Sequence, residues 1–355
     1  MKRALLLALA AVSMSMSTVK GVEPHERFAK WAQEFRIHFR DETHSASVFQ
    51  KWLNNDQFIQ EINERNLTYS LGHNPFSGMD LDEFRRFYLW DSRLPKRSED
   101  RTYDATFQGS DPLPSTIDWT ANGAVTPVKD QGQCGSCWSF STTGALEGAF
   151  YLNTGSLTSF SDQQLVDCDT LKNGGRDHGC NGGLMDNAFS WIAKNNGLCQ
   201  EVDYPYVSGS TKTGGTCQTK CSNVKGSDVD HFTDVKPSSD EDMMAALSKR
   251  PVSIAIEADQ REFQLYKSGV FTGACGTTLD HGVLVTGYGS ESSEVDTSGK
   301  SLDFYLVKNS WSKSWGLNGY IKLGRGINPE TGATYNDGAG QCGMLLQASY
   351  PVLVV

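Results

Sequence analysis

The sequence predicts an α+β fold, with a helical half, then a half of antiparallel, barrel-like strands, and a helical segment in front of both. Three observations support this. Apolar residues between 137 and 151 recur at helical spacing, and short β-branched or aromatic runs separated by glycines occupy residues 230–350. All nine cysteines lie at or beyond residue 134, which sets the N-terminal part apart. With 38% hydrophobic residues, the 355-residue chain can build a packed core.

The charge balance excludes one class of function. The formal net charge is -10, and no cluster of lysines and arginines supplies a basic face. Binding to nucleic acid needs such a face, so we expect no nucleic-acid partner. The sequence has no internal repeat and no apolar stretch long enough to span a membrane.

The N-terminus has the three parts of a signal peptide. Lys2 and Arg3 precede an apolar run at 4–12, and small serines follow as far as Ser17. The run is too short to cross a bilayer, and a buried N-terminal helix is the alternative. We expect residues 1–17 to be a signal peptide, which predicts a secreted or lysosomal/vacuolar protein.

Residues 18–112 are expected to form a helical segment that ends in an exposed linker. Its apolar stripes contain Phe28, Trp31 and Phe35 and then Phe49, Trp52 and Leu53. Residues 95–112 are polar and rich in turn formers, as an accessible cleavage site would be. Asn66 begins the sequence's one Asn-x-Thr sequon, so we expect glycosylation there.

Residues 113–225 are expected to form the helical half. Leu146 and Phe150 lie four residues apart on one helical face, while Gly144 and Gly148 let a neighbouring element approach the helix closely. The Asn-Thr-Gly sequence at 153–155 should end this helix.

The β half is expected to begin near residue 230. Its strand-like runs are 251–259, 281–289, 303–311 and 319–326. The polar stretch at 290–302 should be a surface loop. A helical half beside a β half predicts a cleft between them, where active sites are common.

The stretch DQGQCGSCWSF at 130–140 allows three chemistries. With Cys217 and Cys221, its two cysteines have the spacing of a structural zinc site. A redox Cys-x-x-Cys pair expects a βαβ context, and no strong strand pattern precedes this one. The third interpretation is a nucleophile, because Cys137 stands where the helical pattern begins and a helix N-terminus lowers the pKa of a thiol.

A nucleophilic cysteine needs a base and a group that orients the base. His281 at the mouth of one predicted strand and Asn309 at the end of another are candidates for these roles. Nine cysteines is an odd number, so in an oxidising compartment at least one should remain unpaired. The count alone does not identify it.

These residues together resemble a papain-family cysteine protease of the cathepsin L-like branch, carried as a preproenzyme. The resemblance rests on Cys134-Gly-Ser-Cys137-Trp138, on the downstream His281 and Asn309, and on Gln131 shortly before the motif. It implies a papain-like two-part fold, with residues 18–112 as an inhibitory propeptide and 113–355 as the protease domain. A non-catalytic relative is the rival interpretation, but such proteins usually lack the nucleophile or the histidine.

The resemblance assigns a role to each site residue. Cys137 is implied as the nucleophile, His281 as the base, Asn309 as its orienting amide, Gln131 as an oxyanion donor and Trp311 as the indole that shields the Asn–His contact. Substrate binding is implied for Gly182, Gly183, Met185, Ala255, Leu279, Gly282 and Gln347, with Trp311 beside them. No long histidine-bearing insertion lies between residues 168 and 180, so we expect endopeptidase action. The pocket residues predict a bulky apolar side chain two positions before the cut.

The resemblance also implies three disulfides, Cys134–Cys180, Cys168–Cys217 and Cys275–Cys342. A fourth, Cys199–Cys221, is inferred from the two cysteines that remain, which leaves Cys137 as the odd thiol. The family's propeptide aspartate is replaced by Gly78. We expect a monomer without metal or cofactor, whose partners are protein and peptide substrates, its own propeptide and cystatin-like inhibitors.

Overall fold

The computed structural model describes residues 23–90, 103, 112–292 and 301–354. The expected signal peptide, most of the 95–112 linker and the centre of the 290–302 loop therefore lie outside the described residues. Within the described ranges, no helix combines the length and apolar character needed to cross a membrane.

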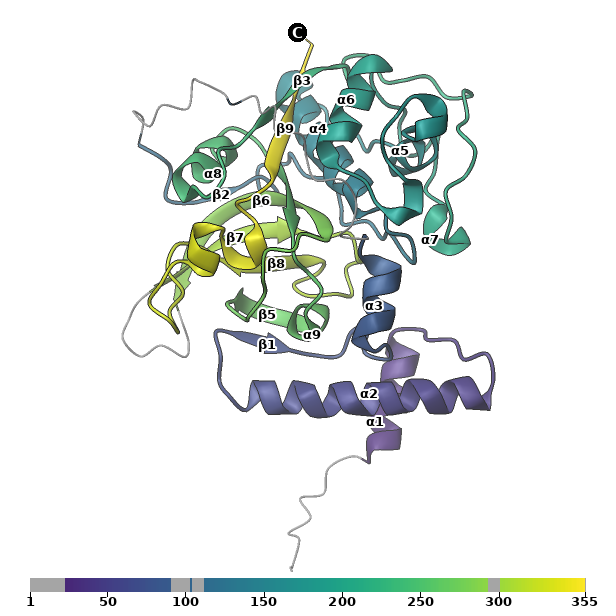
Figure 1. Ribbon diagram of the computed structural model, residues 1–355, viewed down its shortest axis with the longest axis vertical. Coiled ribbons are helices and arrows are strands. Elements are labelled where there is room, and N and C mark those ends of the chain that lie inside the picture. Colours follow the sequence, from purple (N-terminus) through teal and green to yellow (C-terminus); the bar gives the residue numbers. More distant parts are fainter. Residues whose placement is uncertain (1–22, 91–102, 104–111, 293–300, 355) are drawn as a thin grey trace, which may run out of the picture.

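The N-terminal segment begins with two helices that lie below the rest of the molecule, and it then runs up to the edge of the sheet (Figure 1). Its elements are α1 (Pro24–Glu34), α2 (Glu42–Asn63), β1 (Tyr69–Leu71) and α3 (Leu81–Tyr88). The expected apolar stripes meet here, because Phe28 and Trp31 of α1 pack on Trp52 of α2. Asp41 caps α2, and Asp80 with Glu83 forms a capping box on α3, which fixes where these helices start.

The helical half follows the linker, as the sequence predicts. Its helices are α4 (Cys137–Thr154), α5 (Asp162–Cys168), α6 (Met185–Lys194) and α7 (Ser208–Thr211), with short 3-10 turns at Leu171–Asn173 and Gly179–Asn181. Helix α4 ends where the Asn-Thr-Gly sequence predicts, because Gly155 adopts the left-handed conformation with φ 72°.

The β half is a nine-stranded sheet with the order β1-β5-β8-β7-β6-β4-β9-β3, and β2 also pairs with β6. Its strands are β2 (Ile117–Asp118), β3 (Val229–Asp234), β4 (Val252–Ile256), β5 (Tyr266–Phe271), β6 (His281–Ser292), β7 (Ser301–Lys308), β8 (Tyr320–Gly324) and β9 (Ala348–Leu353). Helices α8 (Asp240–Leu247) and α9 (Arg261–Gln264) and 3-10 turns at Tyr335–Gly338 and Gln341–Gly343 lie among them.

Two features of this sheet differ from the expectation of purely antiparallel strands. Strands β5 and β8 pair in parallel, and the N-terminal segment adds β1 to the free edge of β5. The first is possible because β6 and β7 lie between β5 and β8 in the chain, so no hairpin joins the two strands. The second arises because an edge strand offers unpaired backbone groups to any extended segment that reaches it.

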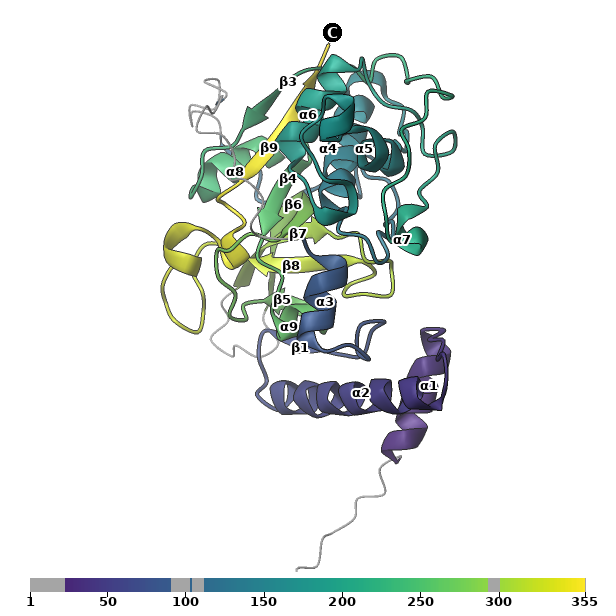
Figure 2. The same ribbon diagram turned by 45° about the vertical axis from the view of Figure 1, so that its right-hand side comes forward.

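The two halves meet along helix α4, which packs against β4 and β6 (Figure 2). A Cβ atom on Gly144 would lie 2.9 Å from Leu284 Cδ2, and one on Gly148 would lie 2.8 Å from Pro251 Cγ. The predicted close approach to these glycines is therefore confirmed. Ser141 Oγ donates to Val283 O at 2.7 Å, so the start of α4 is held directly against the strand that begins with His281.

Candidate active site

Cys137 is the first residue of α4, at the meeting line of the two halves. It is fully buried and is the free cysteine of the described chain. The backbone N–H of Gly282 donates to its sulfur at 3.4 Å. Because Gly282 directly follows His281, this bond places the thiol beside the first residue of β6.

His281 is held by two neighbours from the end of β7. Its Nε2 lies 2.8 Å from Asn309 Oδ1, and its ring stacks on Trp311 with 4.5 Å between centroids. An amide oxygen only accepts, so Nε2 carries the proton. His281 Nδ1 is buried and has no hydrogen-bond partner among the described residues, so this nitrogen is available to accept a proton.

Gln131 comes from the loop before α4 and is also fully buried. Its side-chain oxygen accepts from Ser310 Oγ at 2.6 Å, which turns its amide nitrogen toward the start of α4. That nitrogen donates to Cys134 O at 3.0 Å and to Tyr88 O at 2.9 Å. The amide of Gln131 is thus already a donor to a peptide carbonyl.

The cysteine pairs are Cys134–Cys180, Cys168–Cys217, Cys199–Cys221 and Cys275–Cys342. Cys134 is therefore bonded away from Cys137, and Cys217 and Cys221 belong to different bridges. These pairings leave no thiolate set for the zinc interpretation and no Cys134–Cys137 redox pair. Among the described residues, no group of three or more His, Cys, Asp or Glu side chains could hold a metal ion.

Comparison with known proteins decides the family. The chain matches the family described as "Papain family cysteine protease" over residues 113–352 and the "Cathepsin propeptide inhibitor domain (I29)" over residues 28–84. The chain belongs to the papain family of cysteine proteases. Its N-terminal segment is the propeptide, so this chain is the zymogen.

The relatives from Arabidopsis thaliana that this chain resembles are named as cysteine proteases. "Probable cysteine protease RD21C" is 40% identical over 97% of this chain and 72% of its own length. "Cysteine proteinase RD21A" is 45% identical over 86% of this chain but 61% of its own length, and "Cysteine protease XCP2" is 38% identical over 97% and 95%. This chain thus spans less than two thirds of RD21A.

Solved structures of precursors share the fold of the whole zymogen. "Recombinant stem bromelain precursor" has a TM-score of 0.79 and 33% identity, covering 94% of this chain and 99% of that one. The proform of the ragweed pollen allergen Amb a 11 has a TM-score of 0.78 and 33% identity, covering 94% and 95%. These likenesses confirm the predicted α+β fold with its N-terminal propeptide.

The propeptide of the protease crosses directly over the site. After α3, Tyr88 O meets the Gln131 amide, and Trp90 N donates to Asp280 O at 3.0 Å. The Trp90 indole N–H donates to Leu279 O at 3.1 Å. This path covers Cys137 and His281 with backbone and an indole ring.

The residues expected to bind substrate lie around Trp90. The indole belongs to the same apolar cluster as Met185, Ala255 and Leu279. Gly282 faces Met185, since a Cβ on it would lie 3.1 Å from Met185 Sδ. Of the other expected residues, Gly182 and Gly183 lie just before Leu184, the N-cap of α6, and the half-buried Gln347 accepts from Ala255 N at 3.0 Å through its carbonyl.

The covered site favours neutral side chains. Burial raises the pKa of the Cys137 thiol to about 12, although the Gly282 N–H opposes the rise. Burial also lowers the pKa of His281 to about 4, against the hydrogen bond to Asn309. With the propeptide in place, the pair is therefore thiol and neutral imidazole, because both charged forms would be deprived of water.

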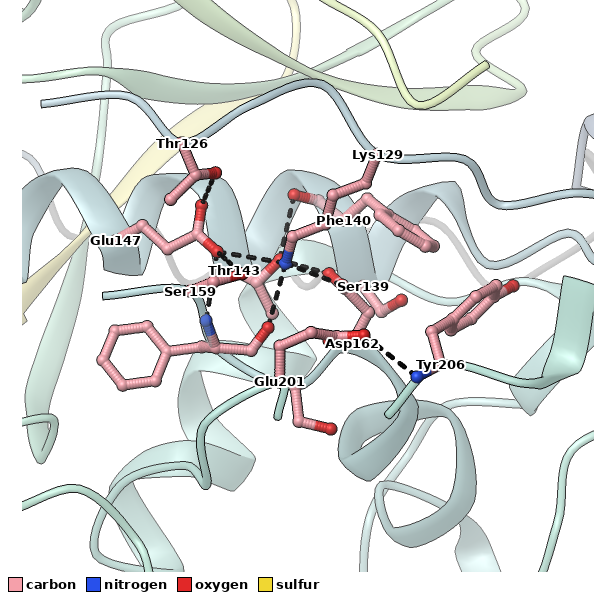
Figure 3. Close-up of polar contacts among 12 residues, drawn as sticks. Thr126, Lys129, Ser139, Phe140, Thr143, Glu147, Ser159, Asp162, Glu201 and Tyr206 are labelled. Atoms are coloured by element: carbon pink, nitrogen blue, oxygen red, sulfur yellow. Dashed lines mark hydrogen bonds and ion pairs between the residues drawn. The ribbon is translucent and has the colours of Figure 1, made fainter. Parts of the chain in front are cut away.

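A buried network of charges supports the helix that carries Cys137 (Figure 3). Lys129 Nζ donates to Glu147 at 3.1 Å, to Asp162 at 2.8 Å and to Phe160 O at 2.9 Å. The two carboxylates raise the pKa of Lys129 above its ordinary value even though burial opposes this. Lys308 joins through Thr126, so the network runs from α4 across to β7.

Sequence reasoning missed several residues that the structure brings to the site. Ser310 orients Gln131, Trp90 fills the apolar pocket, and Lys129 holds the charge network. Their positions offered weak signals at most: Lys129 stands just before Gln131, and Trp90 is an aromatic residue at the end of the last propeptide helix. Neither signal reveals a contact with a distant part of the chain.

Proposed function

We propose that the protease hydrolyses internal peptide bonds through a Cys137 thiolate and a His281 imidazolium. His281 Nδ1 takes the thiol proton, and the thiolate attacks the peptide carbonyl carbon. The imidazolium then protonates the leaving amine, which leaves an acyl-enzyme, and a water activated by His281 releases the acid. The observation that carries the proposal is the free Cys137 sulfur bonded to Gly282 N, next to a histidine whose other nitrogen is held by Asn309.

Asn309 and Trp311 would keep this histidine in place. The Asn309 oxygen selects the tautomer with the proton on Nε2, which leaves Nδ1 to receive the thiol proton. Trp311, which is 1% exposed, covers the ring and the amide contact, so water does not compete for it. An amide orients the ring without adding charge, and its hydrogen bond opposes the lowering of the His281 pKa by burial.

Gln131 and the Cys137 backbone N–H would stabilise the oxyanion of the tetrahedral intermediate. Gln131 Nε2 already donates to the carbonyl of Tyr88 at 2.9 Å, within the range of a useful hydrogen bond. Removing one such donor typically costs about 3 kcal/mol of transition-state stabilisation. Because Ser310 and the Cys134 carbonyl both hold Gln131, the donor is preorganised.

The propeptide, residues 18–112, would inhibit because it enters the site in the wrong direction. It runs from Tyr88 at the Gln131 amide to Trp90 in the apolar pocket. In a substrate the pocket residue precedes the cut, so the chain runs from the pocket toward Gln131. The propeptide therefore fills the cleft without presenting its peptide bond productively. We expect cleavage in the linker and a mature chain, the protease domain 113–355, that starts near residues 111–113.

The pocket would prefer a bulky apolar residue two positions before the cut. Trp90 supports this, because its indole packs with Met185, Ala255 and Leu279. Met185 is flexible and adapts to different shapes, so discrimination among apolar side chains should be modest, roughly 1–3 kcal/mol per methylene. Gln347 would contribute one polar contact at the far end of this pocket.

The remaining proposals concern where the protease works and with what. Four disulfides fit an oxidising compartment, which supports secretion or delivery to a vacuole or lysosome. Proteins and peptides would be the substrates, cystatin-like proteins would be inhibitors, and the protein would act as a monomer. Asn66 is exposed in the loop after α2, where a glycan would be removed with the propeptide.

The test compares the full chain with its Cys137→Ala variant. On acidification, the wild type should lose the mass of the propeptide and then hydrolyse a peptide library, whereas the variant should stay full-length and inactive. A trace of wild type should cut the variant to the same mature mass, which shows that its linker and fold are intact. Appreciable turnover by purified, trans-processed Cys137→Ala would overturn the proposed role of the thiolate.

A further inference from the structure

Three carboxylates gather near the start of β6, where His281 stands. Asp280 directly precedes His281, and Glu257 and Asp259 follow strand β4. Glu257 is occupied by the fold, because its oxygens accept from the backbone N–H groups of Gly276 and Thr278. Asp280 accepts from Ala258 N at 2.8 Å and is 6% exposed. Asp259 is the accessible member of the group, with 26% of its side chain exposed.

A guanidinium of the propeptide is bound to Asp259. Arg85 of α3 forms an ion pair with Asp259 Oδ2 at 3.0 Å and donates to the Asp259 carbonyl at 3.2 Å. Burial raises the pKa of Asp259 and of Asp280, and Arg85 is the positive charge that opposes the rise at both. Asp259 therefore already binds a cation in the zymogen.

The path of the propeptide shows which side of the cut this cation occupies. Trp90 marks the pocket for the residue that precedes the cut, and Tyr88 O marks the oxyanion donor. Arg85 lies further along the same line, beyond Tyr88. Phe84 next to it packs edge-on against Trp311 at 5.1 Å, on the far side of His281. Arg85 therefore occupies the side on which the leaving part of a substrate would lie.

The release of the propeptide removes this cation and opens the site. Asp259 Oδ1 keeps the Gln260 amide as a partner at 2.9 Å, but the described chain shows Arg85 as the group bonded to Oδ2. With Arg85 gone, the Asp259 carboxylate loses its cation and raises the pKa of the neighbouring Asp280 without opposition. A guanidinium or ammonium on the substrate would restore the lost pair.

We propose that Asp259, with the buried Asp280 beside it, forms a subsite for arginine or lysine in the substrate residues that follow the cut. This proposal rests on the proposed endopeptidase function. Asp259 is then a specificity-determining residue on the leaving side, complementary to the apolar pocket before the cut. Arginine is the side chain to test first, since Arg85 Nη2 alone already reaches both the carboxylate and the Asp259 carbonyl.

The experiment uses the activated protease and two series of internally quenched peptides. All share the same residues before the cut and carry arginine, its neutral isostere citrulline or glutamate at the first or the second position after it. We expect kcat/KM for arginine to exceed that for citrulline by about two- to fivefold at one of these positions, as for a partly exposed ion pair. The Asp259→Asn variant should bring this ratio close to one.

Asp230→Asn is the matched control, because Asp230 is an acid on β3 with 65% of its side chain exposed, away from the cleft. It should keep the wild-type ratio. High salt should also reduce the ratio in the wild type, which tests the ion pair even if Asp259→Asn folds poorly. An arginine-to-citrulline ratio of one at both positions, a ratio that persists in Asp259→Asn, or one insensitive to salt overturns the subsite.

The outcomes separate the two proposals. If no peptide is cut by the activated protease, the endopeptidase function and the subsite are both wrong. If the citrulline peptides are cut and arginine gives no advantage, the endopeptidase function stands and the Asp259 subsite alone is wrong.

Discussion

Replacing Lys129 by methionine should destabilise the protease strongly. Glu147 and Asp162, which are 1% and 0% exposed, would lose the ammonium that bonds to both. Breaking a buried ion pair by removing one partner costs about 3–5 kcal/mol, because the remaining charge is left without water or counter-charge. Lys308 reaches Glu147 only through Thr126, so it cannot replace Lys129 at Asp162.

The pH dependence of the loss follows from the same geometry. Burial raises the pKa of Asp162 even in the presence of Lys129. Without Lys129, both carboxyls would titrate at higher pH in the folded state than in the unfolded chain. The folded variant then binds more protons than the unfolded one, so its stability rises as the pH falls from 7 toward these raised pKa values. The deficit relative to the parent should therefore be smaller at pH 5 than at pH 7.

The assay is urea unfolding of the full chain in the Cys137→Ala background, which prevents self-digestion. Lys172→Met, at an exposed position in the 3-10 turn Leu171–Asn173, is the control and should change the free energy of unfolding by less than about 0.5 kcal/mol. Adding Asp162→Asn to Lys129→Met should recover part of the loss, since it removes one unpaired charge. A loss below about 1 kcal/mol, or an equal loss at both pH values, would refute the reasoning.

Three further predictions concern the propeptide and the pocket. Trp90→Ala should allow the zymogen to hydrolyse a small fluorogenic peptide before acidification, because the pocket is emptied and the indole hydrogen bond to Leu279 O is lost; a fully latent variant would contradict this. His73 stacks on Trp52 and contacts Asp56, and burial lowers its pKa below the ordinary 6.5. Its protonation should therefore loosen the propeptide as the pH falls below 6.5, and His73→Gln should move the midpoint of activation to lower pH, whereas equal midpoints would exclude His73 as a trigger. Gln347→Glu should raise kcat/KM for arginine relative to leucine two positions before the cut by a few-fold where the glutamate is ionised, and an unchanged ratio would remove Gln347 from the pocket.

Features that depend on neighbouring residues followed from the sequence. Helix α4 begins at Cys137 and ends before Gly155 as predicted, because helix starts and stops are encoded by local periodicity and by a glycine that tolerates positive φ. The apolar stripe of Phe28 and Trp31 on α1, the apolar position of Trp52 on α2 and the close packing at Gly144 on α4 also follow from spacing within each helix. The strand-like runs could also be predicted from local sequence patterns. The strands with which they pair could not.

Strand pairing needed the tertiary structure. The Tyr69–Leu71 segment is too short to predict as a strand, and it becomes one because the edge of β5 supplies its hydrogen bonds from about two hundred residues away. The parallel pairing of β5 with β8 depends likewise on the route of the chain between them. No periodicity within either segment specifies a partner at that distance.

The sequence alone predicted which residues carry the chemistry, since Cys137, His281, Asn309 and Gln131 stand in a pattern that resembles the family. Only the tertiary structure decided what surrounds them: Trp90 in the pocket, Arg85 on Asp259, and Lys129 between two buried carboxylates. It also decided the direction of their pKa shifts, because burial in the folded zymogen raises the pKa of Cys137 and lowers that of His281. Burial and charge pairing are sums over neighbours from distant parts of the chain, so they exist only once the chain has folded.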